Sequence, residues 1–296
     1  MAPHAADVQR VVDRYLNAEA SASMVAMELL QLTEDPEAVV RVLPTLAGDR
    51  ARLRELQRLF EENQAGCRTI VAMIRRRLDS PDVADDADEG IARSRRLFDA
   101  SVAHSEESSV ALYSLGSAEL LAVATDEVVG VLEAWEVLGP ARDALEIGCG
   151  IGRLMVPLAP RLRSVVGTDV SPGMVAAARR RLDACANASV HETAGRDLSE
   201  FESGSLDLVY SVDTFPYLVL AGQALVERHF REIRRVLRPG GDFVLFNYAY
   251  GRPRDADARE VLALADAAEL AVVRADQSPF RIWNGIGWLM RRSAQS

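Results

Sequence analysis

Lysine is absent from this 296-residue sequence, and all 34 basic residues are arginine. The absence excludes enzymes that form a Schiff base through lysine, and it excludes the P-loop nucleotide site, which needs a lysine for its phosphates. The 44 acidic residues give a formal net charge of −10. Residues 81–139, called the acidic belt below, carry this excess, with 13 acids and 3 arginines. Because such a belt repels a phosphate backbone, we expect no nucleic acid among the partners.

Cysteine and histidine are scarce. The three cysteines, Cys67, Cys149 and Cys185, are far apart, and none of the 4 histidines stands at metal-ligand spacing. We therefore predict no bound metal and a reducing compartment. The sequence also lacks a run of about 20 apolar residues, the length that crosses a bilayer, and it does not start with the basic and apolar regions of a signal peptide. We expect a soluble, cytoplasmic protein that does not bind membranes.

The first 80 residues show the periodicity of helices. Apolar residues recur at three-and-four spacing, which places them on one helical face, over residues 8–30, 39–46 and 53–78. Asp35-Pro36 predicts the start of a helix. Gly48-Asp49 predicts a stop and a new start, after which one helix is expected to run through residue 78. We predict that residues 1–80 form a helical hairpin or three-helix bundle, either a lid on the acceptor site or the surface of a homodimer.

The rest of the chain predicts an α/β domain over residues 91–296, joined to the first by an acidic linker at 81–90 that contains five acids and a proline. Helices are expected before Gly139, most clearly at Thr125–Leu138. From Arg142 onward, short apolar runs alternate with helical patterns, which is typical of a mostly parallel sheet with helices on both faces. The seven predicted strands are Ala144–Ile147, Ser164–Thr168, Ser189–Glu192, Leu206–Ser211, Asp242–Asn247, Leu270–Ala275 and Gly287–Arg291. The predicted helices between them are Arg153–Ala159, Pro172–Ala184, Gln223–Leu237 and Asp255–Ala268.

The stretch ALEIGCGIGRL, Ala144 to Leu154, places glycines at alternate positions between a strand and a helix. Glycine is needed where the backbone takes a positive φ or approaches a ligand closely. In a parallel sheet, the amides of such a turn and of the helix N-terminus are expected to face the crevice at the carboxyl ends of the strands. Asp169 ends the next strand, where a carboxylate can accept ribose hydroxyls. These two signals together predict a ligand that contains a nucleoside.

The glycine spacing differs from that of dinucleotide sites, which read GxGxxG, because the third glycine is Gly152 and Arg153 follows it. An acid, Glu146, also stands two residues before Gly148. In these features the sequence resembles the class I S-adenosylmethionine-dependent methyltransferases, whose first motif is an acid followed by GxGxG. The resemblance covers residues 91–296 and includes four further motifs in order: VVGTDVSPGM, AGRDL, SLDLVYSVD and VLRPGG.

The resemblance implies which residues contact S-adenosylmethionine. Asp169 would bind the ribose hydroxyls, and Met174 would cover the adenine, although core packing is an alternative for Met174. Asp213 would lie near the methionine end, although it is also placed to cap a helix. The full set of expected cofactor contacts is Glu146, Gly148, Cys149, Gly150, Gly152, Asp169, Val170, Met174, Arg196, Asp197, Leu198, Ser211 and Val212.

The chemistry implied by the resemblance needs little from the protein, because a methyl group on a sulfonium is already electrophilic. The enzyme supplies alignment and desolvation, and it adds a general base only for a weakly nucleophilic acceptor. Candidate catalytic residues are His104, Tyr113 and Asp213. An acceptor pocket is expected from five aromatic residues, some of which are equally suited to the core: Phe215, Tyr217, Tyr248, Tyr250 and Trp283.

Three functions remain open on the sequence alone. The first is methyl transfer to a small molecule, at an oxygen, nitrogen or carbon atom. The second is methylation of a protein or peptide side chain, with the acidic belt recruiting a basic partner. The third is a cofactor-binding scaffold without catalysis.

Overall fold

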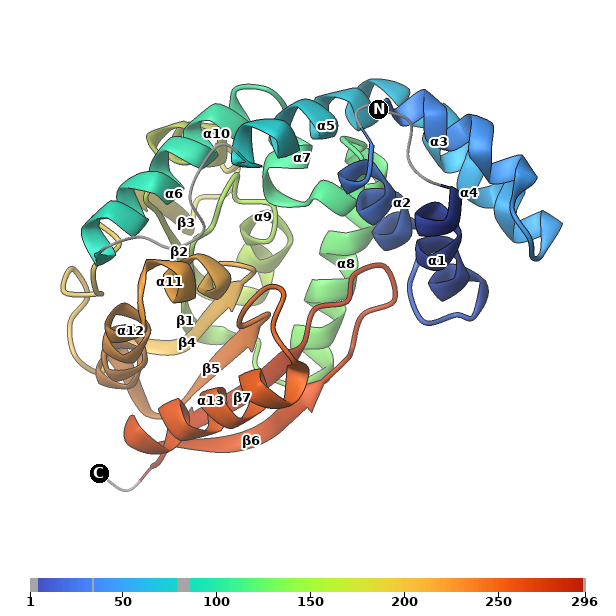
Figure 1. Ribbon diagram of the computed structural model, residues 1–296. Helices are drawn as coiled ribbons and strands as arrows, with labels where there is room; N and C mark the ends of the chain where they lie inside the picture. The colour runs from blue at the N-terminus through green and yellow to red at the C-terminus, as the bar shows by residue number, and fades with distance from the viewer. Residues whose placement is uncertain (1–4, 34, 79–85, 295–296) are drawn as a thin grey trace. The chain divides into compact units, whose positions relative to one another are not determined.

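The computed structural model describes residues 5–33, 35–78 and 86–294, which form two compact units (Figure 1). The first unit takes in the described residues up to 78, together with 100–127 and 280–284. The second takes in the described residues from 86 to 99, 128–279 and 285–294. Of the predicted linker at 81–90, residues 81–85 lie outside the described residues and Ala87–Gly90 belong to a helix.

The first unit is helical. Asp35 and Asp49 cap helices as predicted, the first accepting from the amide of Glu37 at 2.9 Å and the second from that of Ala51 at 2.7 Å. The prediction of one helix from Asp49 to residue 78 was wrong, because the helix ends at Asn63 and a second begins at once. The elements of this unit are α1 (Ala5–Leu16), α2 (Ala22–Gln31), α3 (Pro36–Val42), η1 (Leu43–Thr45), α4 (Arg50–Glu62), α5 (Gln64–Leu78), α7 (Glu106–Val110) and η2 (Leu112–Ser114).

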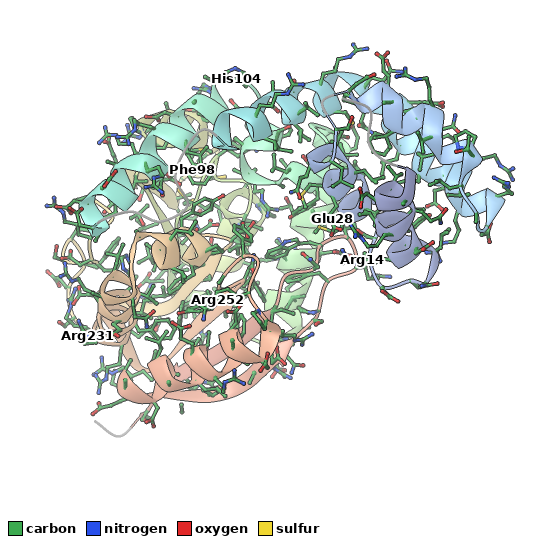
Figure 2. All side chains as sticks on the ribbon, viewed as in Figure 1. Arg14, Glu28, Phe98, His104, Arg231 and Arg252 are labelled. Atoms are coloured by element: carbon green, nitrogen blue, oxygen red, sulfur yellow. The ribbon has the colours of Figure 1, made fainter. Side chains whose placement is uncertain are left out.

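The amphipathic faces of these helices form a core of their own. Buried side chains from α1, α2, α4 and α5 pack together, with Leu115 among them. An ion pair between Arg14 and Glu28, 2.5 Å apart, joins α1 to α2 at the edge of this core (Figure 2). The apolar stripes predicted from the sequence therefore bury against one another within the chain.

A segment near the carboxyl end of the chain, residues 280–284, completes the first unit. Ser21, at the start of α2, donates from its hydroxyl to the carbonyl of Ile282 at 2.5 Å. The carboxylate of Glu127 accepts from the amide of Ile282 at 3.0 Å. The ring of Trp283 is stacked with that of Tyr113, with centroids 6.2 Å apart. This segment is fixed by polar bonds at its backbone and by aromatic packing at its end.

The second unit contains the predicted seven-stranded sheet, in the order β3-β2-β1-β4-β5-β7-β6. All neighbours pair in parallel except β7, which is antiparallel to β5 and to β6. All seven predicted strands are present, with somewhat longer bounds: β1 (Gly139–Ile147), β2 (Leu162–Asp169), β3 (Ala188–Glu192), β4 (Leu206–Val212), β5 (Leu237–Phe246), β6 (Leu270–Gln277) and β7 (Gly287–Arg292). The α/β fold class is confirmed.

Helices flank the sheet. The helices that lie wholly in this unit are α9 (Met155–Leu158), η3 (Ala159–Arg161), α10 (Pro172–Arg181), α11 (Phe215–Ala221), α12 (Gln223–Val236) and α13 (Arg254–Ala267). Two others, α6 (Ala87–Val102) and α8 (Ala118–Ala134), have residues in both units. The helix predicted at Thr125–Leu138 corresponds to α8 and begins and ends earlier. No helix within the described part of the chain is both long and apolar enough to cross a bilayer.

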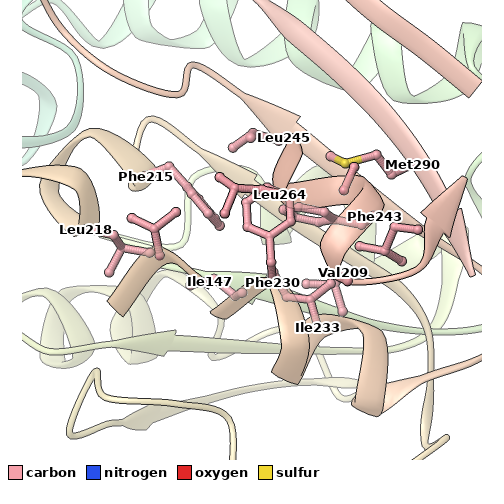
Figure 3. Close-up of a cluster of buried hydrophobic side chains, with 14 of the residues drawn as sticks. Ile147, Val209, Phe215, Leu218, Phe230, Ile233, Phe243, Leu245, Leu264 and Met290 are labelled. Atoms are coloured by element: carbon pink, nitrogen blue, oxygen red, sulfur yellow. The ribbon is translucent and has the colours of Figure 1, made fainter. Parts of the chain in front are cut away.

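A large apolar cluster lies between the sheet and α11, α12 and α13 (Figure 3). Leu145 and Ile147 of β1 point into it, so alternation along the strand places Glu146 on the opposite face. Phe215 of α11 is fully buried there, with ring contacts to Phe230 and Phe243. Helix α11 was not predicted, because its seven residues FPYLVLA are apolar nearly throughout and show no helical alternation.

Candidate functional site

The glycine turn after β1 has the backbone conformation that its sequence requires. Gly148, Gly150 and Gly152 have φ values of +70°, +52° and +71°. A Cβ at Gly148 would overlap the side chain of Thr214, and one at Gly152 would lie 3.2 Å from the Cβ of Ala178. Both the positive φ and the close packing therefore exclude larger residues from the turn.

The sequence predicts that the amides of this turn face a ligand, and in the structure three of them bond to residues at the end of β2. Those of Gly148 and Cys149 donate to the carbonyl of Thr168 at 2.8 and 3.0 Å. The amide of Gly150 donates to the carboxylate of Asp169 at 2.9 Å. The reason is the neighbouring strand, because β2 ends beside the turn and its last residues supply acceptors for these amides.

Asp169 is the polar centre of the site. It ends β2 with only 8% of its surface exposed, and its two carboxylate oxygens accept from the amides of Gly150 and Ser171, both at 2.9 Å. Burial raises its pKa from the usual value to about 6, against the lowering effect of these two amides. Asp169 is thus held in one orientation at the carboxyl edge of the sheet, where a nucleoside is expected.

Glu146 is a second buried carboxyl group, on β1. It is 3% exposed, and the hydroxyl of Tyr210 on β4 donates to it at 3.0 Å. Burial raises its pKa to about 8, and the negative charge of Asp169 contributes in the same direction. Burial likewise raises the pKa of Cys149, so its thiol is neutral at pH 7. A cationic ligand nearby would favour the ionised form of each of these two acids.

The loops after β2 and β3 contain the next expected cofactor contacts. Met174 is fully buried in the first turn of α10, where its amide donates to the hydroxyl of Ser171 at 3.1 Å. Leu198 is also buried, and Val170 is partly exposed. Asp197 binds the amide and hydroxyl of Ser199, and Arg196 forms a two-pronged ion pair with Asp88 of α6 at 2.6 and 2.8 Å. Arg196 is therefore already engaged by α6.

The ends of β4 and β5 are joined by an unusual pair. Asp213 and Asn247 are not glycines, yet they have φ values of +63° and +68°, and the side-chain amide of Asn247 donates to the Asp213 carboxylate at 2.6 Å. Strained backbone of this kind is concentrated at functional sites. Of the two residues before Asp213, Val212 is 9% exposed, and Ser211 is fully buried.

The predicted aromatic residues separate into three groups. Tyr217 and Tyr250 are in edge contact at 6.0 Å, so α11 and the loop after β5 meet there. Phe215 and Tyr248 are buried in the core, and burial raises the pKa of Tyr248. Trp283 belongs to the first unit, as do Tyr113 and His104. His104 is exposed after α6, and its ring bonds the carbonyl of Ala100 at 2.7 Å.

Sequence reasoning missed two residues of the site. Thr214 packs on Gly148 and donates from its hydroxyl to the carbonyl of Ile147 at 3.1 Å. Ser171 caps α10 and donates its backbone amide to Asp169. A serine followed by proline at the first helical position is a recognisable N-cap, so Ser171 could have been found. Thr214 left no such signal.

Comparison with known proteins concerns the part of the chain that carries these residues. A family model described as a methyltransferase domain matches residues 145–245, about a third of the chain. The probable S-adenosylmethionine-dependent methyltransferase CRG1 of Saccharomyces cerevisiae is 30% identical over 129 residues, which are 42% of this chain and 41% of that protein. The sterol 4-C-methyltransferase strm-1 of Caenorhabditis elegans is 26% identical over 121 residues, 39% of this chain and 34% of that protein. The chain thus spans less than half the length of these relatives.

A solved structure has the same fold. Phosphoethanolamine N-methyltransferase 1 of Haemonchus contortus, in complex with phosphoethanolamine and S-adenosylhomocysteine, aligns with 70% of this chain and 50% of its own, at a TM-score of 0.56 and 17% identity. At this identity, the likeness concerns the fold alone.

Proposed function

We propose that this chain, which belongs to the class I S-adenosylmethionine-dependent methyltransferases through a domain at residues 145–245, transfers a methyl group from S-adenosylmethionine to a small-molecule acceptor. The observation that carries the proposal is the buried Asp169 carboxylate, fixed by two amides beside the glycine turn. This is the chemistry that a ribose diol requires: a rigid acceptor of hydroxyl hydrogens next to backbone without side chains.

The charge of the site fits the cofactor. S-adenosylmethionine carries a sulfonium and an ammonium group, and the site contains two buried acids, Glu146 and Asp169. Positive charge nearby offsets the cost of ionising such carboxyl groups. We propose that Asp169 accepts the ribose hydroxyls and that Met174, Val170 and Leu198 form the apolar surface for the adenine.

Bound S-adenosylmethionine supplies an electrophilic methyl group, so the residues of this chain need only orient the two reactants and exclude water. Asp169 and the glycine turn fix the nucleoside. The pair of Asp213 and Asn247 fixes the ends of β4 and β5, where Tyr217 and Tyr250 offer aromatic surface to an acceptor. We propose that these four residues line the acceptor site, with Asp213 as the polar group that orients the nucleophile.

The acidic belt favours a small acceptor over a protein. At least four of its 13 carboxylates bond within the chain: Asp88 with Arg196, Asp99 with Ser171, Glu127 with Ile282 and Glu133 with Arg161. These four acids offer less free charge to a basic partner. The sterol named for one relative is a small molecule, which supports the same choice.

Radioactive methyl transfer separates the three candidate functions. The protein is incubated with methyl-labelled S-adenosylmethionine and cell extract, and low-mass compounds are then separated from proteins. We expect label in the low-mass fraction as new compounds, and none with Asp169→Ala. Label in protein would support side-chain methylation instead. If all label remained in S-adenosylmethionine, whichever fraction of the extract was added, a scaffold would be supported.

Cofactor affinity is expected to fall at acidic pH. Burial raises the pKa of Asp169 to about 6, so below that pH the carboxyl is protonated and loses its capacity to accept both ribose hydroxyls. Affinity is therefore full above the pKa and decreases by up to about tenfold per pH unit below it. The affinity for S-adenosylhomocysteine is measured by calorimetry at several pH values between about pH 8 and about pH 5. The variant Asp169→Asn, which cannot titrate, should show weak binding with no such slope, and equal slopes would contradict the assignment.

A further inference from the structure

Helix α6 supplies a carboxylate to the loop that carries Asp169. Asp99 accepts from the hydroxyl of Ser171 at 2.6 Å and from the amide of Gly173 at 3.0 Å, both through the same oxygen. Ser171 in turn donates its own amide to Asp169 and accepts from the amide of Met174. The start of α10 is thus capped twice, once by Ser171 and once by a residue 72 positions away in sequence.

These bonds fix the loop through charge. Hydrogen bonds to an ionised acceptor are the stronger kind, and a negative charge at a helix N-terminus is favourable. Asp99 makes two such bonds at the first turn of α10. Since Ser171 lies between Asp99 and Asp169, the position of the Asp169 carboxylate depends on α6.

The residue before Asp99 contacts the other side of the site. The ring of Phe98 is in edge contact with that of Tyr217 on α11, with centroids 4.8 Å apart, and Figure 2 labels Phe98 on α6. Tyr217 also contacts Tyr250 from the loop after β5. Two adjacent residues of α6 therefore reach the proposed cofactor loop and the proposed acceptor loops.

Other contacts of α6, apart from the pair of Asp88 and Arg196, are of a different kind. Arg95 pairs with Glu192 at 2.9 Å, with about half of each side chain exposed, and such surface pairs contribute little. Ile91 packs near Gly195: a Cβ added at Gly195 would lie 3.3 Å from the side chain of Ile91. Among these contacts, the polar bonds of Asp99 are the ones directed at the Asp169 loop.

We propose that Asp99 is a positioning residue that holds the ribose-binding loop in place, and that with Phe98 it makes α6 a mechanical link between the cofactor loop and the acceptor-side helix α11. The inference rests on the proposed function. It assigns to α6 a part in cofactor affinity, without direct contact between Asp99 and the cofactor.

The test uses S-adenosylhomocysteine binding to the full chain, measured by calorimetry. We expect Asp99→Ala to raise the Kd about tenfold or more at about pH 8, because both bonds to the loop are lost. Asp99→Asn keeps an acceptor oxygen and should stay within about threefold of wild type. The matched control is Arg95→Ala, which breaks an exposed ion pair on the same helix and should change the Kd by less than about twofold.

Two further readouts distinguish positioning from general stability. In the protein without cofactor, hydrogen exchange at the Gly173 amide should be about tenfold faster in Asp99→Ala and unchanged in Arg95→Ala. Burial raises the pKa of Asp169, and the negative charge of Asp99 contributes in the same direction. Asp99→Asn should therefore move the acid limit of binding to lower pH, an effect that altered packing would not produce.

The link to α11 is tested by a double-mutant cycle. Tyr217→Ala should weaken S-adenosylhomocysteine binding in wild type and have no further effect in Asp99→Ala. Additive effects would overturn the link, and an unchanged Kd in Asp99→Ala with unchanged exchange at Gly173 would overturn the positioning role. If wild type itself does not bind S-adenosylhomocysteine, the proposed function fails. If wild type binds and Asp99→Ala binds equally well, the inference alone fails.

Discussion

Asp169→Ala is expected to weaken S-adenosylhomocysteine binding at least about 100-fold. The substitution removes the acceptor of the ribose hydroxyls and leaves the amides of Gly150 and Ser171 without their partner. Each hydrogen bond to a charged group contributes about 1.5–3 kcal/mol, and about 2.7 kcal/mol corresponds to a 100-fold change in Kd. Calorimetry at about pH 8, where Asp169 is ionised, measures the loss directly.

The matched control for this prediction is Asp183→Ala, the same change at an exposed position after α10. It should bind S-adenosylhomocysteine as wild type does. Binding by Asp169→Ala within about threefold of wild type would contradict the assignment of Asp169 and, with it, the proposed nucleoside site.

Gly66→Ala is expected to destabilise the first unit by about 3 kcal/mol or more, a large change for a single methyl group. A Cβ at Gly66 of α5 would overlap the carbonyl oxygen of Leu115, and the Cα of Gly116 is only 3.1 Å away. Leu115 cannot move easily, because it is fully buried and has a φ of +52°. The backbone of α5 and the turn after η2 are in contact because neither has a side chain between them.

Thermal unfolding measures this cost, with an expected decrease in Tm of roughly 10 °C. Gly130→Ala serves as the control, since Gly130 lies inside α8 with nothing within 4 Å of an added Cβ. It should raise stability by about 0.5–1 kcal/mol, as alanine does in a helix. A Tm for Gly66→Ala equal to that of wild type would show that α5 and the turn can separate at little cost.

Much of this fold follows from local sequence. The seven strands were predictable because each is a short apolar run next to a helical pattern. The helix caps at Asp35 and Asp49 were predictable because aspartate and proline have specific roles at helix starts. The break at Asn63 and helix α11 were missed. At Asn63 the apolar residues keep the same helical face on both sides of the break, so the sequence does not mark it. In α11 nearly every residue is apolar, so no single apolar face can be recognised.

The site was predictable only in part. The glycine turn and Asp169 are short-range patterns, so their positions could be read from the sequence. The hydrogen-bond partners of the turn's amides could not be read from the sequence. They lie at the end of β2, so they depend on the packing of β2 beside the turn. Asp99 gave no signal either, since its bonds to Ser171 and Gly173 depend on where α6 lies in the folded second unit.

The short segment at residues 280–284 determines the order in which the chain can be completed during synthesis. Ser21, Tyr113 and Glu127 reach the ribosome exit long before their partners at Ile282 and Trp283. At about 5–20 residues per second, translation from the end of α5 to residue 284 takes roughly 10–40 s. During that interval Ile282 and Trp283 have not been synthesised, so the contacts that complete the first unit form last.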